Sequence, residues 1–161
     1  MKNLSVSAEK FSSPPPCSAQ MDRYLIYNAE FKLMICRTCQ VGLPSGNILR
    51  HIRMHHQETW KAHKPALKTH VENLDLAPLQ SLTDAQPDGV REPIEGIKIV
   101  GGWCCSEESC QVAGISEQYV RKHAQKLHGW KATTEKIWFG CQLQTLLGNP
   151  YIKFLLLIEH V

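Results

Sequence analysis

The sequence lacks most of the features that assign a protein to a broad class at once. Its longest apolar run, Phe154–Ile158, is far too short for a transmembrane helix. The segment Met1–Lys10 lacks the apolar core of a secretory signal, so we expect an intracellular protein. A net charge of +3 is too weak to indicate a histone-like nucleic-acid binder. The 161 residues are enough for one or two small domains.

Cysteine and histidine are the residue types that stand out. The chain has seven cysteines and eight histidines. Cysteines of an intracellular protein stay reduced, and an odd number of them cannot pair completely. Several of them also lie close to histidines in the sequence. This distribution favours metal ligation over a disulfide framework.

One set of these residues has the spacing of a two-cysteine, two-histidine zinc site: Cys105, Cys110, His123 and His128. Two thiolates at a strand turn and two imidazoles about one turn apart on the following helix can close a tetrahedron around one ion. Such a site has no open position for a substrate, so we expect structural zinc and no catalysis. Cys104 is an alternative to Cys105, but its five-residue gap to Cys110 is outside the usual range.

A second set of four lies earlier in the chain: Cys36, Cys39, His51 and either His56 or His55. The eleven residues between Cys39 and His51 are one fewer than usual. The Cys-Gln-Val sequence at Cys39 recurs at Cys110, and a histidine-rich stretch and a tryptophan follow both, which indicates an internal repeat. If the repeat keeps the four-residue histidine gap, His56 is the fourth ligand, and His55 is the alternative. The two sets predict two Zn²⁺ ions.

Composition divides the chain into five stretches. Residues 1–22 are rich in serine and proline and are expected to be a disordered tail. A first zinc-finger-like unit (23–60), a short helix with an acidic, Pro-containing linker (61–96), a second zinc-finger-like unit (97–130) and C-terminal strands (131–161) follow. The expected fold is a small α+β domain with two ββα-like zinc-finger units, held together by zinc.

Periodicity predicts the elements of the first half. Residues 24–27 and 31–35 are expected to form a hairpin, and a helix of about ten residues should begin at Ile48. A second, short helix has Pro65 near its start. The stretch Ala77–Glu95 is expected to be an irregular linker.

The second half should contain strands around one helix. Ile97–Val100 and Trp103–Cys105 are expected to be strands that reverse direction at Gly101-Gly102. Ser116 should begin a helix that Gly129 ends. Two further strands are expected at Ile137–Phe139 and Tyr151–Ile158.

Basic residues gather on the two expected finger helices. Residues 45–64 and 116–131 each hold four basic residues and one acidic residue, whereas residues 72–96 hold six acidic residues and one basic residue. The candidate nucleic-acid contacts are Asn47, Arg50, Arg53, Tyr119, Lys122 and Lys126. Pro44 and Ser116 would be poor base readers. About 48 residues separate the two sets, so the fingers cannot follow the major groove as a tandem array.

The order of the motifs is more distinctive than any one of them. It comprises a Leu25–Asn28 hairpin, the first Cys/His set, an acidic spacer, Gly101–Trp103 before the second set, His128–Trp130 at its end, Cys141-Gln142 and a closing strand. Over residues 23–158 this order resembles the fungal family named after the orsellinic acid biosynthesis cluster protein D.

The resemblance implies a fungal protein with two C₂H₂-like zinc-finger segments. In that family the first set resembles two cysteines and two histidines with a four-residue histidine gap, which favours His56. The adjacent Cys104-Cys105 and the short apolar C-terminal end, Leu155–Val161, depart from the family pattern. The end of the chain leaves two alternatives, a complete last strand or a fragment of a longer protein.

The sequence therefore predicts a zinc-binding, non-catalytic interaction module for a protein partner. The alternatives are DNA or RNA binding through the basic finger helices, and a fragment of a larger fungal protein in which the zinc fold is only structural. We expect neither a membrane nor a small-molecule substrate as partner. The finger chemistry favours the nucleus as the compartment.

Overall fold

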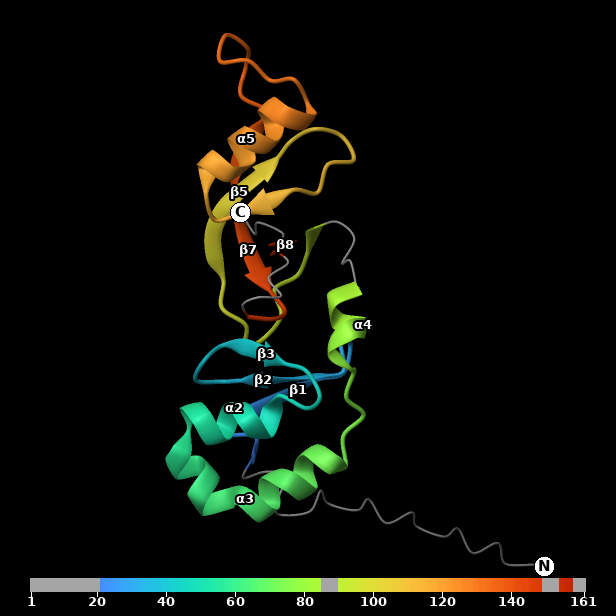
Figure 1. Ribbon diagram of the computed structural model, residues 1–161, viewed down its shortest axis with the longest axis vertical. Helices are drawn as coiled ribbons and strands as arrows, with labels where there is room; N and C mark the ends of the chain where they lie inside the picture. The colour runs from blue at the N-terminus through green and yellow to red at the C-terminus, as the bar shows by residue number, and fades with distance from the viewer. Residues whose placement is uncertain (1–20, 85–89, 149–153, 158–161) are drawn as a thin grey trace, which may run out of the picture.

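The computed structural model describes residues 21–84, 90–148 and 154–157. They form a small, mixed α+β fold that is elongated along one axis (Figure 1). Residues 1–20 of the expected tail lie outside the described residues, and Met21, which follows them, is fully buried. Among the described residues no helix is long and apolar enough to cross a membrane.

The N-terminal half is built on a three-stranded antiparallel sheet. Its strands β1 (Leu25–Asn28), β2 (Leu33–Cys36) and β3 (Val41–Leu43) are neighbours in chain order, which confirms the predicted hairpin. All four residues of β2 are buried, because successive side chains point to opposite faces and both faces are covered. Met34 and Cys36 belong to one apolar cluster, and Leu33 and Ile35 belong to another.

Two consecutive helices pack against this sheet. The helix α2 (Ile48–His55) confirms the one predicted from Ile48, and α3 (Gln57–Glu72) follows after a single residue. Ile48, Ile52 and Leu67 are buried against the strands. The prediction of a short helix with Pro65 near its start is wrong, since Pro65 lies inside α3.

The reason α3 tolerates this proline is packing on both sides of it. Proline removes one backbone hydrogen bond from a helix interior and clashes with the preceding turn. Trp60 before Pro65, and Leu67 and Val71 after it, all join the same apolar cluster. The packing of these residues offsets the free-energy cost of the proline, so tertiary contacts allow the helix to continue through Pro65.

The C-terminal half contains a five-stranded sheet in the order β4-β8-β7-β5-β6. The strands are β4 (Val90–Arg91), β5 (Val100–Cys105), β6 (Ala113–Gly114), β7 (Trp138–Thr145) and β8 (Phe154–Leu157). Only the β4–β8 pair among them is parallel. The helix α5 (Glu117–Leu127) buries Val120 and Ala124 against β5 and β7. As predicted, Ser116 caps it by accepting a hydrogen bond from the Tyr119 N–H, and Gly129 with φ +63° follows its end.

The prediction of a turn at Gly101-Gly102 is wrong. The strand β5 runs through both glycines and pairs with β7 from Val100 to Cys105. A Cβ atom at Gly102 would lie 2.3 Å from the Leu143 side chain and 2.9 Å from the Gly114 carbonyl oxygen. Glycine is thus needed there because neighbouring strands approach closely, and not because the chain reverses.

Three further boundaries differ from the prediction. The stretch 77–95 is not an irregular linker throughout, since it contains α4 (Leu79–Asp84), whose Leu82 is buried, and β4. Residues 97–99 lie outside any strand, and the strand expected at Ile137–Phe139 extends to Thr145. Of the strand expected at Tyr151–Ile158, residues 151–153 and 158 lie outside the described residues.

The apolar cluster to which Leu33 and Ile35 belong, together with a set of polar contacts, joins the two halves. The cluster consists of Leu33, Ile35, Leu82, Ile94, Ile97, Leu146, Leu147 and Leu155. Beside it, Gly42 forms a β-bridge with Leu147, and the Lys98 N–H donates to the Gln40 carbonyl oxygen at 3.1 Å. The helices α2 and α3 lie at one end of the molecule and α5 lies at the other (Figure 1).

Candidate metal centres

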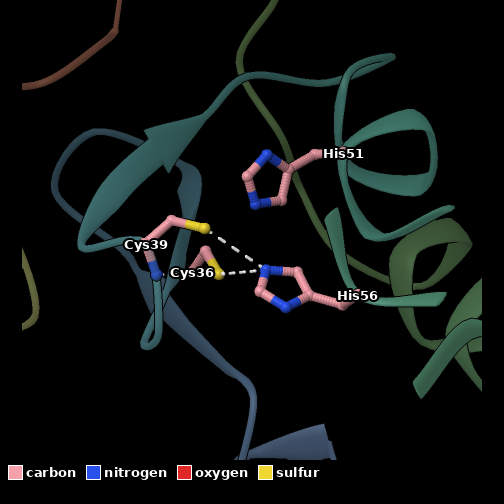
Figure 2. Close-up of side chains that lie close together, drawn as sticks. All are labelled: Cys36, Cys39, His51 and His56. Carbon is pink, nitrogen blue, oxygen red and sulfur yellow. Dashed lines mark hydrogen bonds between the residues drawn. The ribbon is translucent and has the colours of Figure 1, made fainter. Parts of the chain in front are cut away.

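Four side chains of the N-terminal half converge on one point, as Figure 2 shows: Cys36, Cys39, His51 and His56. One ligand atom from each lies within 4.8 Å of all the others. The His56 Nε2 atom is 3.2 Å from the Cys36 sulfur and 3.3 Å from the Cys39 sulfur. Cys36 is buried, Cys39 is exposed, and the histidines are half-buried. The centre therefore lies at the surface of the unit and not in its core.

Local backbone geometry positions these four side chains. Cys36 is the last residue of β2, and the chain turns back through Gln40, whose φ is +54° and whose N–H donates to the Cys36 carbonyl oxygen at 2.7 Å. The turn also directs the Cys39 N–H at the Cys36 sulfur, 3.5 Å away. His51 lies within α2, whereas His56 is its C-cap, with φ −135° and ψ 58°. This non-helical residue separates α2 from α3 and carries its imidazole to the cysteines (Figure 2).

The C-terminal half contains a second convergence of the same kind: Cys105, Cys110, His123 and His128, again with one atom from each within 4.8 Å of the others. The His123 Nε2 atom lies 3.1 Å from the Cys110 sulfur and 3.1 Å from the His128 Nε2 atom. Cys105 ends β5, and Ser109, with φ +65°, returns the chain to Cys110. His123 lies within α5 and His128 is its C-cap. In each centre, the four candidate ligands therefore come from the end of a strand, a turn, a helix and the C-cap of that helix.

Both sets fit a tetrahedral metal ion. Bond lengths of about 2.3 Å to sulfur and about 2.0–2.1 Å to nitrogen place the ligands of a tetrahedral Zn²⁺ roughly 3.3–3.8 Å apart. The separations of 3.1–3.3 Å found here approach that range. Two imidazole Nε2 atoms that face each other, as in His123 and His128, are expected when both rings point at one cation. Both clusters could therefore hold a metal ion.

The structure also separates the alternatives that the sequence left open. His56 lies with the cysteine sulfurs, whereas the neighbouring His55 is exposed and is not part of the four-residue set. Cys105 joins the second set, whereas the Cys104 sulfur lies 3.0 Å from that of Cys141 on β7. Adjacent residues of a strand point to opposite faces, so Cys104 and Cys105 cannot both reach one ion.

Burial sets the proton affinities of several of these groups. It lowers the pKa of His51 to about 4, and the nearby His55 and His56 add to the effect. Burial likewise lowers the pKa of His123. These imidazoles are neutral near pH 7, which is the form that binds a metal. Burial raises the pKa of the Cys39 and Cys105 thiols, so a metal ion that binds their thiolates must displace protons.

The six candidate nucleic-acid contacts are all exposed: Asn47, Arg50, Arg53, Tyr119, Lys122 and Lys126. Asn47 and Arg50 also line a pocket of about 570 Å³ beside the first centre, together with Met54. The first three belong to α2 and its N-cap and the other three belong to α5, so the structure does not bring the two groups together (Figure 1). Pro44 is buried and cannot contact a base in this fold.

Two features of the fold were missed by sequence reasoning. Gln144 on β7 is fully buried and bonds to the backbone of Ile94 and Ile97. Lys136 lies over two tryptophan rings beside the second centre. Gln144 lies between Leu143 and Thr145 in a strand that also contains Gln142, so nothing in the local sequence distinguishes it or indicates its partners, which are about 50 residues earlier.

Comparison with known proteins places both centres in one family. The family model described as "Orsellinic acid/F9775 biosynthesis cluster protein D" matches residues 23–129. The chain belongs to this family. The matched segment contains all eight residues of the two sets and ends immediately after His128.

A curated relative with the same description, from Emericella nidulans, is 22% identical over 140 residues. The alignment covers 87% of this chain but only 27% of that relative, so the chain spans about a quarter of the relative's length. No solved structure matches the chain.

Proposed function

We propose that the chain binds two Zn²⁺ ions in closed Cys₂His₂ centres of ββα-like units, and that it is a non-catalytic interaction module for a protein partner. The observation that carries the proposal is the ligand count. Each centre has four protein ligand atoms in convergent positions. A four-coordinate ion held in this way has no position for a substrate or an activated water molecule, which a catalytic zinc needs. The soft sulfur and imidazole donors favour zinc over calcium or magnesium.

The element order supports the assignment of both units. In the first, β2 and β3 flank the cysteine turn and α2 supplies the first histidine. In the second, β5 and β6 flank the cysteine turn and α5 supplies the first histidine. Within the described part of the chain, the apolar cluster of the second unit contains four buried residues: Cys105, Val120, Ala124 and Trp138. A core of that size needs the metal as a further source of folding free energy.

Exposed apolar side chains on the finger helices support a protein partner. Met54 on α2 is 59% exposed, and Tyr119 and Leu127 on α5 are 57% and 66% exposed. Ile115, just before α5, is 65% exposed. Apolar and aromatic side chains of this kind form the centre of protein interfaces, whereas nucleic-acid interfaces are dominated by basic residues.

Nucleic-acid binding is the second candidate, because the basic residues of both helices are available. Arg50, Arg53, Lys122 and Lys126 make no ion pair within the described part of the chain. A nucleic-acid complex would use these residues to neutralise phosphates, and its affinity would fall steeply with salt.

The two candidates differ in a direct binding test. The zinc-loaded chain is titrated with mixed-sequence duplex DNA and single-stranded RNA at 50 and 200 mM salt, alongside Arg50→Ala and Lys122→Ala. For a protein-interaction module we expect weak binding that neither substitution changes more than the control Lys68→Ala, an exposed residue of α3. A loss of about tenfold or more for Arg50→Ala or Lys122→Ala alone, with a steep salt dependence, would overturn the protein-partner proposal in favour of nucleic acid.

A further inference from the structure

Three of the chain's four tryptophans gather beside the second centre, and two of them lie at the side chain of Lys136. The Lys136 Nζ atom lies 4.7 Å from the centre of the Trp103 ring and 5.4 Å from that of Trp138. It is also 2.6 Å from the Glu117 Oε1 atom. The ammonium group therefore has two indole rings and a carboxylate as neighbours. We call Trp103, Trp138 and Glu117 the ammonium cage.

The walls of this cage are fixed by contacts that do not involve Lys136. The Trp138 Nε1–H donates to Glu117 Oε1 at 2.9 Å, and the Trp138 ring meets Trp130 edge to face at 4.7 Å. Trp138 is 6% exposed, so it has little freedom to move. In the free chain, hydrogen bonds from Lys136 and Trp138 hold the pKa of Glu117 below its usual range, and the Trp138 bond does not depend on Lys136.

The backbone leaves room for the Trp103 ring. Trp103 on β5 pairs with Gly140 of β7 on one side and with Gly114 of β6 on the other. Neither neighbour has a side chain that could cover the indole. An ideal Cβ atom at Gly140 would approach the Trp103 ring to 4.0 Å, so a larger residue there would narrow the space.

Lys136 itself is the least fixed part of the arrangement. Its side chain is 47% exposed, whereas the next residue, Ile137, is anchored through its carbonyl oxygen to the Ser106 N–H at 2.9 Å. The Lys136 side chain can therefore leave by rotation about its own bonds without moving the strand. Its departure would leave two indole rings and a carboxylate open to solvent.

Aromatic faces combined with a negative charge favour one class of ligand. Aromatic rings bind cations through their quadrupole, and cages of such rings recognise quaternary ammonium groups such as choline and methylated lysine. A lysine ammonium is compact and strongly hydrated, so a methylated ammonium should compete well for the same place. Glu117 would repel a phosphate, so the cage does not suit a nucleic-acid backbone.

We propose that Trp103, Trp138 and Glu117 form a binding site for the N-methylated lysine side chain of a protein partner, and that Lys136 occupies this site in the free chain. The inference deepens the proposed function, since it names a chemical group on the partner, and it rests on that function only in taking the partner to be a protein.

The test uses the zinc-loaded chain and three probes: a short glycine-flanked peptide with one trimethyllysine, the same peptide with unmodified lysine, and choline. Binding is followed by the NMR signals of the indole N–H groups. We expect Lys136→Ala to bind the trimethyllysine peptide at least about tenfold more tightly than the unsubstituted chain, and more tightly than the unmodified peptide. Lys131→Ala, which removes an exposed lysine from the same loop, should behave as the unsubstituted chain does.

Two double variants, each adding one substitution to Lys136→Ala, test whether the gain in affinity comes from the cage. Trp103→Ala and Glu117→Gln should each abolish the gain, and unchanged zinc content shows that the unit is still folded. Equal affinity for the two peptides, or no binding by folded Lys136→Ala, would overturn the cage. Binding of choline without the methylated peptide would overturn the protein source of the ligand. Choline binding does not require a protein partner, so the cage and the protein-partner function can be contradicted independently.

Discussion

His56→Ala is expected to remove one metal ion from the chain, whereas His55→Ala should remove none. His56 contributes the nitrogen atom that lies 3.2–3.3 Å from both cysteine sulfurs of the first centre. Without it an ion has only three protein ligands, and the joint between α2 and α3 loses its anchor. Because the free energy of metal binding contributes to folding, we expect a loss of roughly 4 kcal/mol or more in unfolding free energy.

His55→Ala is a matched control for His56→Ala, because the two histidines are neighbours in the sequence. His55 is exposed and outside the four-residue set, so its replacement should change the unfolding free energy by less than about 0.5 kcal/mol. Metal content by elemental analysis and denaturant unfolding measure both effects. Loss of metal from His55→Ala with retention in His56→Ala would show that the first centre uses the other histidine.

Gln144→Leu is expected to be strongly destabilising, although it lies outside the metal centres. The Gln144 Oε1 atom accepts from the Ile94 N–H at 2.7 Å, and Nε2 donates to the carbonyl oxygens of Ile94 and Ile97 at 3.0 and 2.7 Å. Leucine would leave the Ile94 N–H and the Ile97 carbonyl oxygen without this partner in the buried joint between the halves, whereas the Ile94 carbonyl oxygen still accepts from the Ile97 N–H at 3.3 Å. At about 1–3 kcal/mol for each of these two unsatisfied groups, the loss should be roughly 2–6 kcal/mol.

Gln142→Leu is the control for this prediction, because Gln142 is an exposed residue of the same strand. It should change the unfolding free energy by less than about 0.5 kcal/mol. Denaturant unfolding of both variants in the presence of zinc separates the effect of the hydrogen bonds from that of the metal. An effect of Gln144→Leu no larger than that of Gln142→Leu would mean that the three bonds contribute nothing net to the joint.

The parts of the molecule that the sequence could predict are those governed by local spacing. The cysteine and histidine intervals indicated both four-residue sets, because each set spans a single strand, turn and helix and so depends on nearby backbone only. The choice between His55 and His56 depends on the non-helical residue that separates α2 from α3. The internal repeat indicated His56, but the geometry itself is not visible in the residue pattern.

The remaining features depend on contacts between distant parts of the chain. Gly101-Gly102 has the composition of a turn, yet it lies in a strand because Leu143 and Gly114 approach Gly102 closely. Pro65 is a local signal against a helix interior, yet α3 continues through it because residues on both sides pack against the same apolar cluster. Neither the partners of Gln144 nor the rings around Lys136 could be predicted, since both arise from pairing within the five-stranded sheet and its joint to the first half.

We propose that the two Cys/His sets bind zinc and that this zinc holds the fold together. The most direct measurement is the zinc content of the chain purified without added metal, combined with circular dichroism during titration with a chelator. We predict two zinc ions per chain, one for each four-residue set, and cooperative loss of structure as they are removed. A chain that contains no zinc, or that keeps its structure after all zinc is removed, would contradict the claim.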